Sequence, residues 1–140
     1  MLEGEIRDIY YKKFRAFKLQ YEILYKWMYC DIYQRTLEQT LSAQDICSVM
    51  IYGLGEMGEL IYDKLKGSRI KVECFIDAFS PANQYYLEGI DVLKPYEVKG
   101  RQADLIIISL AHIEESIKKD LIKAGINIPI ESIENIIMGM

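Results

Sequence analysis

Residues 53–58 read Gly53-Leu-Gly-Glu-Met-Gly58 and complete a G-x-G-x-x-G motif. The motif follows an apolar run, Ser48-Val-Met-Ile-Tyr52, and precedes a helical pattern that continues to Lys66. A second apolar run ends in Asp77, 19 residues beyond Gly58, close to the roughly 20-residue spacing of the dinucleotide-binding fingerprint. The motif alone is weak because it is short, but this order of strand, glycine turn, helix, strand and acid predicts a nucleotide-binding fold.

Each position of the motif has a physical role in such a fold. Gly53 allows a tight turn, Gly55 lets the backbone approach a pyrophosphate, and Gly58 lets the new helix pack against the sheet. The start of that helix offers unpaired N–H groups to phosphates. Asp77 would accept hydrogen bonds from a ribose diol and repel a 2′-phosphate, which favours NAD over NADP. The alternative for Asp77 is a solvated acid at a strand end.

Two acidic residues beside the turn weaken this interpretation. Glu56 and Glu59 would lower the affinity for a pyrophosphate unless they point away from it. Acids in a first helical turn also suit the helix dipole when no ligand is present. A degenerate fold, in which the glycines serve only packing, therefore stays open as an alternative.

The composition is that of one acidic domain. The chain has 140 residues, of which 51% are hydrophobic, and a net charge of −4 with scattered basic residues, which argues against nucleic acid as a partner. Three widely separated cysteines suggest neither a disulfide framework nor a zinc site. The first residues lack the basic start of a signal peptide, and the longest apolar stretch, 105–111, is too short to span a bilayer. We therefore expect a reduced, cytoplasmic protein.

Residues 1–46 form a first segment that predicts a long amphipathic helix. They contain no proline and one glycine. Apolar residues recur with an alternating 4-3 spacing typical of a heptad seam, and further apolar residues widen this stripe. The seam is Tyr10, Phe14, Phe17, Tyr21, Leu24 and Met28, and the widening residues are Ile6, Ile23, Trp27 and Ile32. The stripe either packs back onto the rest of the chain, pairs with another copy, or docks on another part of a larger protein, and we favour a homo-oligomer.

Residues 47–140 alternate between strand and helix patterns and predict an α/β domain. We expect strands at 47–52, 70–77, 89–93, 104–109 and 126–130, and helices at 56–67, 95–100, 112–124 and 132–137. This alternation predicts a Rossmann-like parallel sheet of order 3-2-1-4-5 with helices on both faces. Ligands of such sheets bind beyond the carboxyl ends of the strands, between the first and the fourth.

That rule adds residues after the fourth strand to the candidate site. Ser109, Ala111 and His112 would face the glycine turn, and the loop 78–86 would offer aromatic and amide groups. His112 is the only histidine, and it either contacts a ligand or simply begins a helix. The candidate cofactor-binding residues are Gly53, Gly55, Glu56, Met57, Gly58, Asp77, Ser109 and His112.

Catalytic motifs are not evident. The only Tyr-x-x-x-Lys, Tyr62 to Lys66, lies on the helix after the glycine turn, where we interpret it as coincidence. The sequence shows no metal cluster, nucleophile elbow or pair of catalytic carboxylates. We do not expect this chain alone to be a complete dehydrogenase.

Four stretches resemble the Rossmann domains of bacterial surface-polysaccharide biosynthesis proteins. They are 49–62, 75–77, 89–92 followed by Pro95, and 103–109, and the likeness covers about residues 47–137. Such domains occur in sugar O-acyltransferases and in nucleotide-sugar epimerases or dehydratases, and are appended to some sugar methyltransferases and glycosyltransferases. The resemblance implies NAD or a nucleotide sugar as ligand, with the three glycines at the phosphates and Asp77 at the ribose. No acyltransferase repeat or epimerase half follows here, and the N-terminal helix is not part of the likeness.

Three functions stay open on this basis. The first is a binding module for NAD or a nucleotide sugar in polysaccharide biosynthesis. The second is the cofactor domain of an NAD-dependent epimerase or dehydratase, or of a sugar transferase. The third is a degenerate fold that serves as a dimerisation module through residues 1–46.

Overall fold

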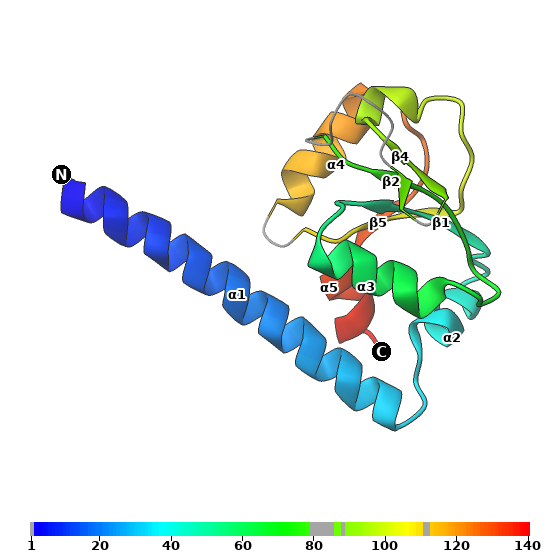
Figure 1. Ribbon diagram of the computed structural model, residues 1–140, viewed down its shortest axis with the longest axis horizontal. Coiled ribbons are helices and arrows are strands. Elements are labelled where there is room, and N and C mark those ends of the chain that lie inside the picture. The colour runs from blue at the N-terminus through cyan, green and yellow to red at the C-terminus, as the bar shows by residue number, and fades with distance from the viewer. Residues whose placement is uncertain (1, 79–85, 88, 111–112) are drawn as a thin grey trace.

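A parallel β-sheet forms the centre of the molecule (Figure 1). The computed structural model describes residues 2–78, 86–87, 89–110 and 113–140. The parallel strands are β1 (Ser48–Tyr52), β2 (Lys71–Ile76), β4 (Ile90–Leu93), β5 (Leu105–Ile108) and β6 (Ile130–Ser132). The sheet order β3-β4-β2-β1-β5-β6 confirms the predicted 3-2-1-4-5 order of the parallel strands. The added edge strand β3 (Tyr86–Leu87) pairs antiparallel with β4, in a stretch that the sequence analysis assigns to a loop.

Helices follow the strands as predicted, with small differences at the ends. They are α3 (Glu56–Leu65), the 3-10 turn η1 (Pro95–Glu97), α4 (Glu114–Lys123) and α5 (Ile133–Met138). The last strand was expected at 126–130 but spans 130–132. Pro129 has no N–H to donate to a ladder, so pairing by both backbone groups begins after it, although its carbonyl accepts from Ile106 N–H at 2.8 Å.

The N-terminal helix α1 (Leu2–Ile32) confirms the predicted long helix but ends well before residue 46. The chain turns through Gln34, which has a positive φ of 60°, and restarts in α2 (Leu37–Ser42). Thr36 begins α2 with a capping box, since its hydroxyl accepts from Gln39 N–H and the Gln39 side chain accepts from Thr36 N–H. Within the described residues, no helix combines the length and apolar character needed to cross a membrane.

Only the C-terminal part of α1 packs on the α/β body. Ile23, Trp27 and Cys30 are buried there, while the N-terminal half projects away from the body (Figure 1). Asp31 near the helix end also forms an ion pair with Lys64 of α3. Among buried side-chain polar atoms of the described residues, Trp27 Nε1 is the one without a hydrogen-bond partner.

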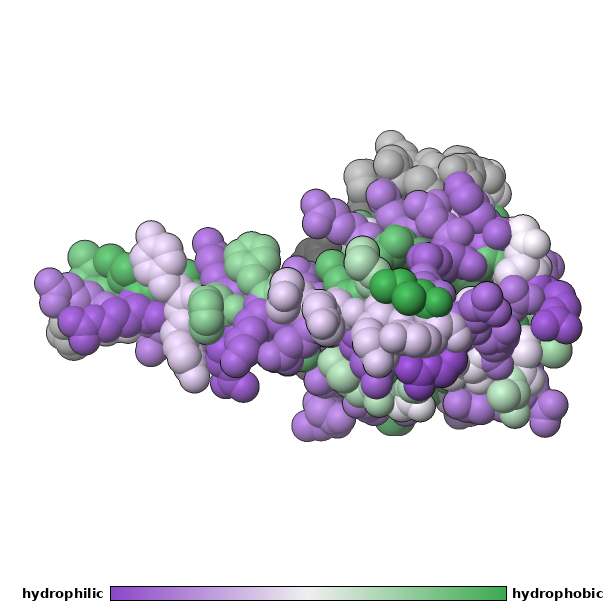
Figure 2. Space-filling view, turned by 90° about the horizontal axis from the view of Figure 1, so that it is seen from below, coloured by the Kyte–Doolittle hydropathy of each residue, from purple (hydrophilic) through white to green (hydrophobic). Residues whose placement is uncertain are grey.

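The heptad seam lies on a different face of α1 and stays exposed. Tyr10, Phe14, Phe17, Tyr21 and Met28 are 64–69% exposed, and Leu24 is 41% exposed. Figure 2 shows apolar residues interspersed with polar ones along the projecting part of the helix. Helix α1 therefore has two apolar faces, one buried on the body and one uncovered.

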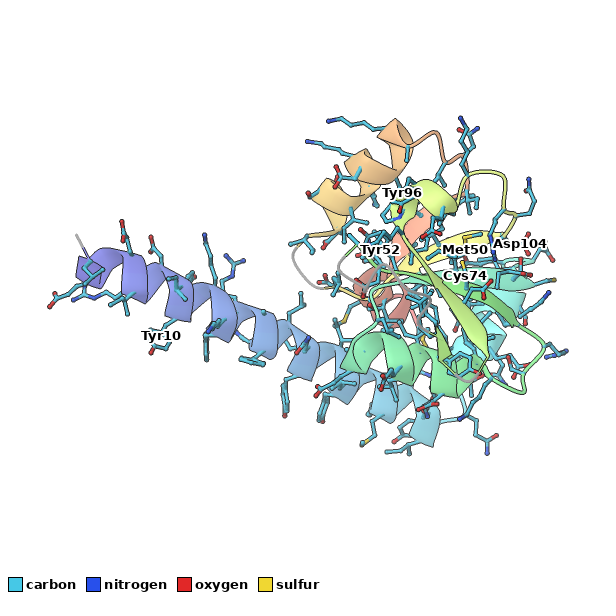
Figure 3. The ribbon with its side chains drawn as sticks, turned by 45° about the horizontal axis from the view of Figure 1, so that its top comes forward. Tyr10, Met50, Tyr52, Cys74, Tyr96 and Asp104 are labelled. Carbon is cyan, nitrogen blue, oxygen red and sulfur yellow. The ribbon has the colours of Figure 1, made fainter. Side chains whose placement is uncertain are left out.

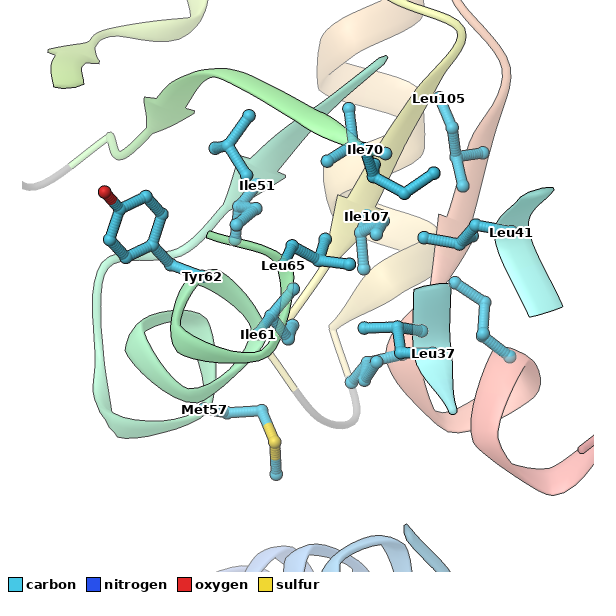
Figure 4. Close-up of a cluster of buried hydrophobic side chains, with 14 of the residues drawn as sticks. Leu37, Leu41, Ile51, Met57, Ile61, Tyr62, Leu65, Ile70, Leu105 and Ile107 are labelled. Atoms are coloured by element: carbon cyan, nitrogen blue, oxygen red, sulfur yellow. The ribbon is translucent and has the colours of Figure 1, made fainter. Parts of the chain in front are cut away.

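Two hydrophobic clusters hold the layers together, one on each face of the sheet. Alternate residues of β1 point to opposite faces, as a strand requires. Met50 and Tyr52 pack with α4, on the same face as Cys74 (Figure 3). Val49 and Ile51 pack with α1, α2, α3 and α5, and Figure 4 shows the labelled side chains of α2 and α3 against the sheet. Residues before position 47 therefore contribute to the same core as the strands.

Candidate functional site

A cleft of about 460 Å³ lies at the carboxyl ends of the central strands. The glycine turn forms one side, the residues after β2 form another, and α4 with the segment before it forms the third. The lining residues are Tyr52, Gly53, Leu54, Gly55, Asp77, Ala78, Leu110, Ile113, Ser116, Ile117 and Asp120. The cleft lies between β1 and β5, which are the first and fourth parallel strands in chain order, where open α/β sheets bind their ligands.

Two glycines of the turn are required by the protein itself. Gly53 has a φ of +103°, and a β-carbon there would overlap the Ser109 hydroxyl. A β-carbon on Gly58 would overlap the carbonyl oxygen of Gly53. These two positions need glycine for the turn and for close packing of α3, whether or not a ligand binds.

Gly55 is different, because nothing in the described structure requires it to be glycine. Its backbone is extended, with φ −134° and ψ −165°, and a β-carbon there would meet open space. Gly55 is also the N-cap of α3, a position where Ser, Asp or Asn would bond the free N–H groups of the first turn. Glycine at this position leaves those N–H groups uncapped at the edge of the cleft.

Asp77 is held against the glycine turn. Its carboxylate accepts a hydrogen bond from Leu54 N–H at 3.0 Å, and its own N–H donates to Leu93 O at 2.8 Å. The side chain is half-buried and lines the cleft. The structure therefore brings Asp77 together with Gly53 and Gly55, as the fingerprint spacing requires.

Ser109 lies beneath the turn and does not line the cleft. It is 4% exposed, and its hydroxyl is 2.8 Å from Tyr52 O and 3.1 Å from Gly53 O. The single hydroxyl proton is therefore within hydrogen-bond distance of two carbonyls of the turn. The Ser109 hydroxyl therefore links the residue that follows β5 to the backbone of the glycine turn. His112 and Ala111, and the loop 79–85, lie outside the described residues.

Neither Glu56 nor Met57 is among the described residues that line the cleft. Both line a separate hollow of about 110 Å³ together with Gln20 and Leu24 of α1 and Leu60 of α3. Met57 also belongs to the hydrophobic core. Since the Met57 side chain is buried, any contact of Met57 with a ligand in the cleft would come from its backbone N–H group.

Tyr52 and Asp120 belong to the cleft but were absent from the sequence-based set. Burial raises the pKa of the Tyr52 hydroxyl, and the carboxylates of Asp120 and Asp77 raise it further. The hydroxyl therefore stays protonated at neutral pH and can donate a hydrogen bond. The helical spacing of Ile113, Ser116, Ile117 and Asp120 places them on one face of α4, and that period was the signal available in the sequence.

The charge of the cleft is acidic. Among the described lining residues there are two carboxylates and neither lysine nor arginine. An anionic ligand would therefore depend on backbone N–H groups at the start of α3. The Tyr62–Lys66 pair contributes nothing here, because Tyr62 is buried against Phe75 and the Lys66 ammonium lies 5.8 Å from the Tyr62 ring.

Comparison with known protein families finds a match for the part of the chain that contains the sheet. A family model described as "C2185-like, N-terminal" matches residues 46–132. The chain belongs to this C2185-like family. The matched region of this C2185-like chain begins just before β1 and ends with β6, so it contains the glycine turn, Asp77 and the α4 wall of the cleft. Helix α1 lies outside the matched region. No curated protein matches the C2185-like chain.

Proposed function

We propose that this C2185-like chain binds NAD or a nucleotide sugar in the cleft above the glycine turn. The main observation behind this proposal is the glycine at position 55. Within the described part of the chain, neither its φ nor close packing requires glycine, and glycine there leaves N–H groups without a side-chain cap open to a phosphate. A ligand that occupies the space beside Gly55 supplies a reason for glycine beyond its ordinary acceptance as an N-cap residue.

The cleft offers a place for each part of such a ligand. The pyrophosphate lies at Gly55 and the start of α3, and Asp77 accepts hydrogen bonds from the ribose diol. The apolar side chains of Leu110, Ile113 and Ile117 offer a surface for the remainder of the ligand. Glu56 lines the hollow beside α1 and is not among the described residues that line the cleft.

The biological setting is part of the same proposal. Residues 47–137 resemble Rossmann domains of surface-polysaccharide biosynthesis proteins, and this resemblance supports a cytoplasmic module that serves glycan synthesis. The described cleft carries Tyr52, Asp77 and Asp120 but no pair like the Tyr-x-x-x-Lys of sugar epimerases. We therefore propose a binding module, with any epimerase, dehydratase or transferase chemistry completed outside the described cleft.

A second function, self-association through α1, is favoured by a separate observation. The aromatic seam stays exposed even where α1 packs on the body, as the 67% exposure of Tyr21 shows. An uncovered apolar stripe of this length is typical of a surface that meets another protein.

Ligand-dependent thermal stability tests the binding proposal. A ligand that binds only the folded state stabilises it, by about 2.7 kcal/mol at a concentration of 100 times Kd. We expect the melting temperature of the full chain to rise with NAD or with one class of UDP-, GDP- or dTDP-sugar, and to rise less with NADP. Unchanged melting with every ligand at millimolar concentration would contradict the proposal.

The variant Gly55→Asp separates binding from folding. An aspartate at this N-cap bonds the free N–H groups of α3 and suits its dipole, so we expect unchanged or higher thermal stability without ligand. The same carboxylate blocks and repels a phosphate, so the ligand-induced shift should disappear. Gln20→Glu is the matched control, because it adds a carboxylate on the α1 side of the turn and should keep the shift.

A further inference from the structure

Helix α1 presents its seam on the side opposite to the body. At 3.6 residues per turn, Tyr21 and Met28 lie roughly 140–160° around the helix from the buried Ile23. Tyr21 is 67% and Met28 69% exposed, although both stand in the part of α1 that packs on the body. Intramolecular packing therefore leaves the seam largely exposed, although Leu24 borders the hollow between α1 and α3.

The ends of the seam carry opposite charges. Continuing the heptad places Arg7 one position before Tyr10 in the seam and Asp31 one position after Met28. In a parallel pair each seam position meets its own copy, so Arg7 would face Arg7 and Asp31 would face Asp31. Such like-charge pairs oppose association.

In an antiparallel pair the same two residues, Arg7 and Asp31, face each other and attract. When Tyr21 faces Phe17 of the second copy, Leu24 faces Phe14 and Met28 faces Tyr10. The next layer outward then places Arg7 of each copy opposite Asp31 of the other. All seam residues meet apolar partners in this arrangement, and both ends close with opposite charges.

We propose that α1 pairs with α1 of a second copy of this chain as an antiparallel coiled coil, closed at each end by Arg7 of one copy and Asp31 of the other. The twofold axis lies between Phe17 and Tyr21. Asp31 already pairs with Lys64, but its carboxylate accepts several hydrogen bonds and its side chain is 26% exposed, so a second cation has access.

The flanks of the seam are compatible with this arrangement. Lys13 and Gln20 occupy equivalent heptad positions on the flank nearer the body, and Gln20 lines the same hollow as Glu56. Lys13 of the second copy therefore approaches the flank where Gln20 and the acidic residue Glu56 border the same hollow. On the other flank the Lys18 side chains of the two copies approach each other near the twofold axis, and Glu22 of the same helix, 4.0 Å from each ammonium, offsets part of their repulsion.

Charge exchange across the pair tests both the partner and the orientation. Sedimentation equilibrium of the full chain should show a dimer. Arg7→Asp alone and Asp31→Arg alone each create like charges at both ends, and we expect the dimer Kd to rise about tenfold or more. The double variant, and an equal mixture of the two single variants, should restore the wild-type Kd. Lys12→Asp and Asp8→Arg are matched controls on exposed positions outside the seam and should not change the Kd.

Each other outcome overturns a stated part of the proposal. A monomeric wild-type chain over a wide concentration range excludes a second copy as the occupant and assigns the seam to a different protein. A dimer whose Kd is unchanged in both single variants excludes the antiparallel arrangement. Circular dichroism of each variant verifies that α1 is intact, and the ligand-shift measurement on wild type is independent of these results.

Discussion

At the scale of single residues, Gly55 and Gly58 of the turn differ in what surrounds them. A β-carbon on Gly58 would overlap the backbone of Gly53, which cannot move without moving the turn. We expect Gly58→Ala to lower the free energy of unfolding by about 1–3 kcal/mol. Gly55→Ala meets open space and should cost less than about 1 kcal/mol, mainly through a poorer N-cap. Urea denaturation of both variants measures the difference, and equal losses would contradict this account of the turn.

Cys74 gives the fold a pH dependence in the alkaline range. Burial raises the pKa of its thiol from 9.0 to about 11. The unfolded thiol ionises around pH 9 while the folded one stays neutral, so unfolding releases a proton between these pH values. Its contribution to stability is complete below pH 9 and is lost as the pH rises toward 11. Urea denaturation at pH 8 and pH 10 should show this loss, and Cys74→Ala should reduce it; an unchanged loss in the variant would assign it to other groups, such as Tyr52.

At the scale of elements, neighbouring residues of α1 have opposite surroundings. Trp27 is 2% exposed in the core and Met28 is 69% exposed on the seam. We expect Trp27→Ala to lower the free energy of unfolding by about 3–5 kcal/mol, because it leaves a cavity between α1 and the body. Met28→Ala should change it by less than about 0.5 kcal/mol when measured at low protein concentration. Similar losses in both variants would mean that α1 packs on the body through another face.

The strand order could be predicted because long apolar runs such as 104–109 alternate with helical patterns. The end of α1 was missed, although Thr36-Leu-Glu-Gln39 carries the capping-box signature that begins a helix. The start of β6 differs from the predicted 126–130 because Pro129 has no N–H to donate to the ladder. In the candidate site, the sequence spacing between Gly58 and Asp77 was enough to predict that Asp77 lies beside the glycine turn. Tyr52 and Asp120 approach each other only through packing of α4 on β1, which local spacing does not encode.

At the scale of the whole molecule, α1 belongs both to the core and to the surface. Sequence analysis assigned Ile23 and Trp27 to a broadened seam, but the structure places them on a separate buried face. The exposed seam and the buried face give overlapping apolar patterns on one helix. The sequence alone does not show which apolar residues belong to which face, because it does not show where the α/β body lies. The helix therefore contributes to folding through one face and leaves the other available for a partner.

The glycine turn has a different neighbour on each side. Gly53, Leu54 and Gly55 line the cleft, while Glu56 and Met57 line the hollow beside α1. The proposed ligand and the proposed helix pair would thus both lie within reach of one short piece of backbone, which would give energetic coupling between the two binding events a direct route. Such coupling is reciprocal: a ligand that strengthens pairing by some factor is bound more tightly by the paired form by the same factor. The abundance of the chain in the cell would then adjust how strongly the cleft holds its ligand.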